Sequence, residues 1–77
     1  MITKEDIIML QDEYNSEFKK GNITPPCEKA YKNLLAGITS HYSRTHWEHY
    51  VNLTERMPEE IEEAYTGLRK ILEPILE

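Results

Sequence analysis

Three histidines and one cysteine are the residues of this chain with the side chains best suited to metal binding or nucleophilic chemistry. His46 and His49 are three residues apart and would share one face of a helix, whereas His41 lies five residues before His46, about 140° away at roughly 100° per residue. A zinc site also needs a fourth ligand, and neither Cys27 nor the acidic residues lie at a spacing from these histidines that is recognised in zinc sites. We therefore expect no metal and no cofactor, and interpret the histidines as surface or packing residues. Whether His46 and His49 sense pH stays open.

Cys27 is the only thiol, and it follows two prolines near the start of a predicted helix. A helix dipole there favours the thiolate, yet the sequence offers this cysteine no identifiable catalytic partner. The chain also has no serine elbow, no glycine-rich phosphate loop and no HExxH pattern. We expect Cys27 to be a small core residue and the protein to have no enzymatic activity.

The size and composition predict one small globular domain over residues 1–77, with 39% hydrophobic and 30% charged residues. No apolar run approaches the roughly 18 residues that a membrane span requires. The N-terminus carries acids where a signal peptide would carry bases, and a lone cysteine is typical of a reducing compartment. We therefore predict a cytoplasmic protein without membrane insertion.

The net charge of -5 is unevenly distributed along the chain. Residues 1–18 carry -4, residues 19–47 carry +4 and residues 48–77 carry -5. These segments either attract one another in the folded protein or form a polar surface for docking.

The first predicted helix covers residues 4–20. Thr3 can cap it by accepting a hydrogen bond from the backbone of Asp6, and Gly21 can end it. Its apolar stripe leaves Glu17 outside and consists of Ile7, Leu10, Tyr14 and Phe18.

The second predicted helix covers residues 25–41, with Thr24 as its cap and two prolines in its first turn. Its apolar face consists of Cys27, Tyr31, Leu34, Leu35, Ile38 and Tyr42. We expect a break between Ser40 and Thr45, because Gly37 and several hydroxyl residues weaken the helix there. Thr45 and Glu48 have capping-box spacing and could begin a third helix over residues 45–57. The alternative is one long helix over residues 25–57.

The last predicted helix covers residues 59–73, between Pro58 and Pro74. Acids fill its first turns, which suits the helix dipole. Its apolar face is broad and consists of Ile61, Ala64, Tyr65, Leu68, Ile71 and Leu72. We therefore predict an all-α fold, a small antiparallel bundle of three or four helices, and a homodimer that covers the excess apolar face of the last helix.

The segment from Ser40 to Met57 holds all three histidines, the only tryptophan and two of the five tyrosines. Because Trp, Tyr and Arg most often anchor protein interfaces, we predict a partner-binding set in this segment. It consists of Tyr42, Arg44, His46, Trp47, His49 and Tyr50. The alternative places Trp47 and Tyr50 inside the bundle and leaves Tyr42, His46 and His49 more exposed.

These observations favour a non-catalytic protein that binds another protein and regulates or inhibits it. The alternative is a helix-turn-helix protein whose later helix, from His46, enters a nucleic-acid groove. The charge opposes that alternative, because residues 46–57 carry only Arg56 against Glu48 and Glu55.

The stretch MPEEIEEAYTGLRKI, which follows an opening helix with the pattern LQDEYNSEF, resembles cytosolic immunity proteins of class IIa bacteriocins. That resemblance implies a helical bundle that acts by binding a membrane receptor complex. It covers two helices and carries no functional residue across. Small, acidic, all-helical proteins of this kind also resemble phage-encoded inhibitors of host machinery and antitoxins. We assign the chain to no family.

Overall fold

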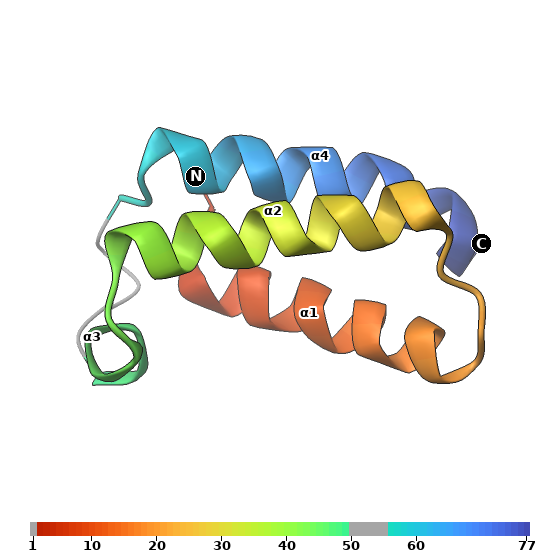
Figure 1. The fold of residues 1–77 in the computed structure, drawn as a ribbon, viewed down its shortest axis with the longest axis horizontal. Coiled ribbons are helices and arrows are strands. Elements are labelled where there is room, and N and C mark those ends of the chain that lie inside the picture. The colour runs from red at the N-terminus through yellow and green to blue at the C-terminus, as the bar shows by residue number, and fades with distance from the viewer. Residues whose placement is uncertain (1, 50–55) are drawn as a thin grey trace.

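The computed structural model describes residues 2–49 and 56–77, and all regular structure in these residues is helical. The helices are α1 (Lys4–Lys19), α2 (Pro25–His41), α3 (Arg44–His49) and α4 (Glu59–Leu76). The three long helices lie side by side along the long axis of the molecule, α2 antiparallel to α1 and α4, and α3 lies at the end of α2 (Figure 1). The predicted all-α bundle is confirmed.

The predicted capping residues at both ends of α1 are confirmed. The Thr3 hydroxyl accepts from the backbone N–H of Asp6 at 3.2 Å, and the Asp6 carboxylate accepts from the backbone N–H of Thr3 at 2.9 Å. After the helix, Gly21 adopts a positive φ of 79°. The backbone N–H groups of Gly21 and Asn22 then donate to the carbonyls of Phe18 and Glu17, both at 3.0 Å, which closes the last turn.

The predicted break after α2 is confirmed, because α2 ends at His41 and Tyr42 is extended. The predicted start of the next helix at Thr45 is wrong. The Ser43 hydroxyl accepts from the backbone N–H of His46 at 3.1 Å and begins α3 at Arg44. Ser43 is the earlier hydroxyl with the correct spacing to cap this turn. The predicted helical end at Met57 is also wrong, since residues 56–58 are not helical, while residues 50–55 lie outside the described part of the chain.

The prediction that Pro74 ends the last helix is wrong, since α4 continues to Leu76. Proline lacks one backbone donor, so in the last turn it removes a single hydrogen bond. Ile75 packs against the core and holds this turn in place.

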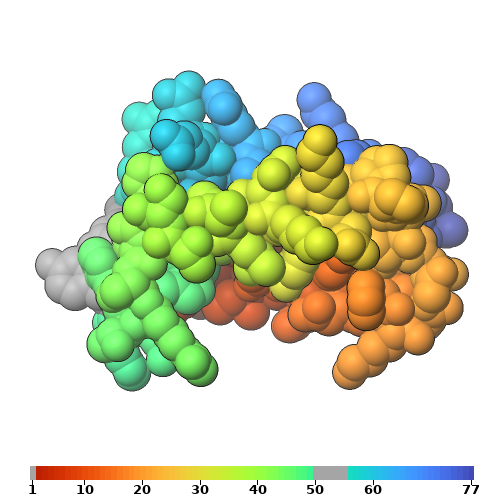
Figure 2. Space-filling view, viewed as in Figure 1, coloured from red at the N-terminus to blue at the C-terminus, as the bar shows by residue number. Residues whose placement is uncertain are grey.

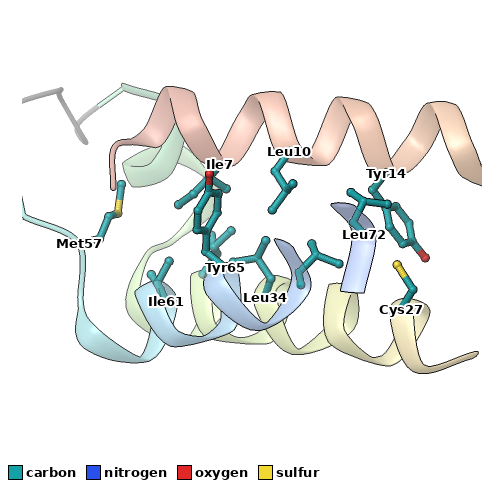
Figure 3. Close-up of a cluster of buried hydrophobic side chains, with 11 residues drawn as sticks. Ile7, Leu10, Tyr14, Cys27, Leu34, Met57, Ile61, Tyr65 and Leu72 are labelled. Carbon is teal, nitrogen blue, oxygen red and sulfur yellow. The ribbon is translucent and has the colours of Figure 1, made fainter. Parts of the chain in front are cut away.

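The core is one cluster of buried side chains between the three long helices (Figure 3). It contains Ile7, Leu10, Tyr14, Cys27, Leu34, Ile38, Met57, Ile61, Tyr65, Leu68 and Leu72. Helices α2 and α4 approach closely at Gly37, where an added Cβ would lie 3.6 Å from Ile61 Cγ1. Four further predicted core residues, Tyr31, Tyr42, Ala64 and Ile71, are partly buried and pack against this cluster. Phe18 and Leu35 were also predicted in the core, but they are 55% and 37% exposed.

Glu17 occupies the core side of α1 where the sequence predicted Phe18. The buried residues of α1 are Ile7, Leu10, Tyr14 and Glu17. From Tyr14, a step of three residues reaches Glu17 on the core side, whereas a step of four reaches Phe18, which lies outside it. The Glu17 carboxylate accepts from Asn22 Nδ2 at 3.0 Å and from Lys20 Nζ at 3.2 Å. The hydrogen bond from Asn22, followed by that from Lys20, lowers the pKa of Glu17.

The structure does not support the reason for which we predicted a homodimer. On α4, Ile71 and Ile75 pack against the core, and Leu76 is the one large apolar side chain of this helix that is exposed. The dimer itself stays a prediction. The other exposed large apolar side chains of residues 2–49 and 56–77 lie on α1 and α2, namely Ile8, Met9, Phe18 and Leu35.

Candidate protein-binding surface at one end of the bundle

The structure places five of the six predicted partner-binding residues together, on α3 and directly before it. Tyr42, His46 and Trp47 form the α3 cluster. The Tyr42 ring lies 5.0 Å from the His46 ring at an angle of 81° and 5.7 Å from the Trp47 ring at 48°. All three side chains are half-buried, and Tyr42 and Trp47 pack against the core. Trp47 is therefore neither fully inside the bundle nor fully exposed, and Tyr50 lies outside the described residues.

Lys4 holds α3 against the start of α1. Its Nζ donates to the backbone carbonyls of Trp47 and of Glu48, the latter at 3.1 Å, and lies 5.4 Å from the centroid of the Trp47 ring. The last carbonyls of a helix have no partner within the helix, and a cation is favourable at that end. Lys4 therefore fixes the position of a helix too short to be stable alone.

Sequence reasoning missed Lys4, although its position carried a signal. It is the first residue of α1, where a positive charge opposes the helix dipole. In the structure, its ammonium group binds the carbonyls of the last turn of α3, where a positive charge is favourable.

Arg44 and His49 are the exposed members of the site, with side chains 92% and 76% exposed. Both approach Glu48: Arg44 Nε lies 3.4 Å from Oε1, and His49 Nε2 lies 4.0 Å from Oε2. Exposed ion pairs contribute little to stability. A carboxylate on a binding partner could therefore replace Glu48 as the ligand of Arg44 at small cost.

His41 belongs to a different contact from the other two histidines. Its Nε2 lies 3.2 Å from Glu60 Oε2 and joins the end of α2 to the start of α4. Residues 2–49 and 56–77 contain no group of three or more His, Cys, Asp or Glu side chains that could hold a metal ion. The described histidines thus form no common ligand set.

Cys27 is a core residue, as the sequence predicts. Its side chain is fully buried, and burial raises the pKa of the thiol. A neutral, inaccessible thiol is a poor nucleophile.

A second surface, which we call the aromatic groove, lies between α1 and α2. It is a hollow of about 350 Å³ that is open to solvent, and its apolar lining consists of Tyr14 and Phe18 of α1 and Tyr31 and Leu35 of α2. The Tyr14 and Tyr31 rings stack with centroids 3.9 Å apart and an interplanar angle of 2°. The sequence did not predict this groove, because the helical periodicity placed Phe18 and Leu35 in the core. In Figure 2, α3 (green) and the end of α1 (orange) project at opposite ends of this face.

Comparison with protein-family models, with curated proteins and with solved structures gave no match. Within the described residues, none of the helices has the length and apolar character needed to cross a membrane.

Proposed function

We propose that this protein is a non-catalytic cytoplasmic protein that binds another protein through α3 and thereby regulates or inhibits it. The binding surface consists of the α3 cluster together with Arg44 and His49. The partner surface offers a carboxylate to Arg44 beside an apolar patch that covers the exposed parts of Tyr42 and Trp47.

The fixed position of α3 is the observation that carries this proposal. Ser43 caps one end of the helix, Lys4 binds the carbonyls at the other end, and Trp47 anchors the middle. A surface held in one arrangement before binding loses little conformational entropy on association. Aromatic and arginine side chains are also the types that contribute most to interfaces.

Charge weighs against the nucleic-acid alternative. Arg44 pairs with Glu48, and Lys32 of α2 pairs with Glu28 at 3.1 Å. Phosphate binding requires clustered cations without acidic neighbours, since each phosphate contact replaces a counterion. Two of the bases that a helix-turn-helix would use are thus partly neutralised.

A photo-crosslinking experiment in the native host tests the proposal. A benzoylphenylalanine residue replaces Thr45, an exposed residue of α3, and in a matched control it replaces Glu73, an exposed residue in the second half of α4. We expect one host protein to crosslink to the chain from position 45 and not from position 73. Adding Arg44→Ala and His49→Ala to the position-45 probe chain should reduce the yield of that adduct.

Two outcomes would contradict the proposal. One is an adduct with nucleic acid alone from position 45, which would favour the helix-turn-helix alternative. The other is the same set of adducts, in equal yield, from both positions.

A further inference from the structure

A second stripe of side chains runs along α1 beside the core stripe. It consists of Lys4, Ile8, Gln11, Asn15 and Phe18, with alternating steps of four and three residues. Asn15 and Phe18 line the aromatic groove, and Lys4 reaches α3 at the other end, so the whole stripe faces the α2 side of α1. Ile8 is 39% exposed and Phe18 is 55% exposed. Alternating steps of four and three are the pattern by which helices pair side by side.

Four of the five stripe residues, all except Lys4, are arranged symmetrically about position 13. The apolar residues of the stripe, Ile8 and Phe18, lie at equal distances on either side of position 13, and its two amide residues, Gln11 and Asn15, lie at equal distances inside them. Two copies of α1 placed antiparallel around position 13 would therefore set Ile8 of each copy against Phe18 of the other. Gln11 would face Asn15 in the same arrangement, so apolar groups meet apolar groups and amides meet amides.

We propose that the occupant of this face is a second copy of the same chain, bound antiparallel through the α1 stripe. A two-fold symmetric pair of this kind uses one surface twice, which is how most homodimers form. Each copy of α1 then covers the exposed side of the aromatic groove of its partner, including Leu35, which is 37% exposed.

The distribution of charge along the molecule selects the antiparallel orientation. The end that contains the starts of α1 and α4 together with α3 carries seven acids and three bases, counted over residues 3–6, 41–49 and 56–63. The opposite end carries six bases and four acids, counted over residues 17–32 and 69–77. Figure 1 shows that these two ends lie at opposite extremes of the long axis. An antiparallel pair brings opposite charges together at both ends, whereas a parallel pair brings like charges together.

Disulfide trapping between two single-site variants tests the register. Purified Ile8→Cys and Phe18→Cys chains are mixed under mild oxidation, and the crosslinked peptides are identified by mass spectrometry. Cys27 is fully buried and can remain in both variants. We expect a disulfide between positions 8 and 18 in preference to 8–8 or 18–18, because only residues with Cα atoms within about 7 Å can be bridged. Predominant 8–8 or 18–18 disulfides would overturn the antiparallel register.

Sedimentation equilibrium of the purified full chain tests the dimer independently of any crosslink. We expect Phe18→Ala to raise the dimer dissociation constant by about tenfold or more, since it removes an apolar contact from both halves of the pair. Met9→Ala is the matched control, because Met9 is an exposed apolar residue of α1 outside the stripe, and it should leave the constant unchanged. Raising the salt concentration should weaken the dimer.

A chain that stays monomeric at millimolar concentration and low salt would overturn the proposal, as would equal effects of Phe18→Ala and Met9→Ala. These measurements use the purified protein alone and change only Ile8, Met9 and Phe18, none of which belongs to the surface proposed to bind the partner through α3. Their failure would therefore leave the proposed function standing, and the reverse also holds.

Discussion

Replacing Lys4 with methionine isolates the contact that holds α3 in place. The substitution keeps an unbranched side chain of similar length and removes the ammonium group. It thereby deletes the hydrogen bonds to the carbonyls of Trp47 and Glu48 and the contact with the Trp47 ring. The start of α1 remains capped by Thr3.

The size of the effect follows from these contacts. Hydrogen bonds to a charged group contribute about 1.5–3 kcal/mol each when buried, but here one is half-buried and the other exposed, so we assign about 1–2 kcal/mol to the two together. The cation–π contact adds about 0.5 kcal/mol at such a site. Removing a positive charge from the first turn of α1 removes an unfavourable interaction with the helix dipole and stabilises the protein by about 0.3–0.5 kcal/mol. We therefore expect a net loss of about 1–2 kcal/mol in the free energy of unfolding.

Urea unfolding followed by tryptophan fluorescence measures this loss directly, because Trp47 is the only tryptophan of the chain. With a denaturant slope of about 1 kcal/mol per molar urea for a chain of this size, the midpoint should fall by about 1–2 M. The native emission of Lys4→Met should also shift to longer wavelength as the ring becomes more exposed. Lys29→Met removes an exposed lysine of α2 and serves as the control.

Two results would refute this reasoning. An unchanged midpoint together with unchanged emission would show that Lys4 does not hold α3. An equal loss in Lys29→Met would show that any lost positive charge destabilises this acidic chain, whatever its contacts.

Three further predictions concern single sites. Gly21→Ala should lower the free energy of unfolding by about 1–2 kcal/mol, because φ is 79° at this residue. Gly67→Ala should raise it by about 0.5–1 kcal/mol, because Gly67 lies inside α4 with open space around it. Urea unfolding of both variants measures the two changes. The pKa of Glu17 lies below its usual value of 4.5, so its contribution to stability is present above that pH and is lost as the pH falls through the folded pKa. Glu17→Gln should flatten this part of the stability profile in acid urea titrations. Cys27 should react with a thiol reagent far more slowly in the native protein than in urea, because it is buried and its pKa is raised; similar rates would contradict its place in the core.

Local rules recovered most of the helices from the sequence. Thr3, Gly21 and Thr24 act within one helical turn, so their side chain or backbone type is enough to predict a start or an end. The steps of three and four in α1 from Ile7 to Tyr14 likewise predicted the core side correctly. Ser43 and Thr45 can both cap a helix, and the capping-box spacing of Thr45 and Glu48 favoured the wrong one, although serine caps somewhat better than threonine.

Side-chain contacts that helical periodicity does not encode account for the features that sequence reasoning missed. By residue type, Phe18 fits the apolar stripe and Glu17 does not. In the structure, however, Asn22 and Lys20 donate hydrogen bonds to the Glu17 carboxylate, and Glu17 lies on the core side in place of Phe18. The partners of Lys4 are 43 and 44 residues away, beyond the reach of any local pattern. The aromatic groove was missed because Phe18 and Leu35 were both predicted in the core, whereas both line the groove.

The sequence separation between Lys4 and Trp47 has a consequence for the order of folding. The turn between α1 and α2 is short, so these helices can meet with a small loss of chain entropy, whereas docking α3 closes a segment more than forty residues long. We infer that α3 docks late and opens first. In native-state hydrogen exchange its amides should exchange by local opening, ahead of those in the middle of α2 and α4.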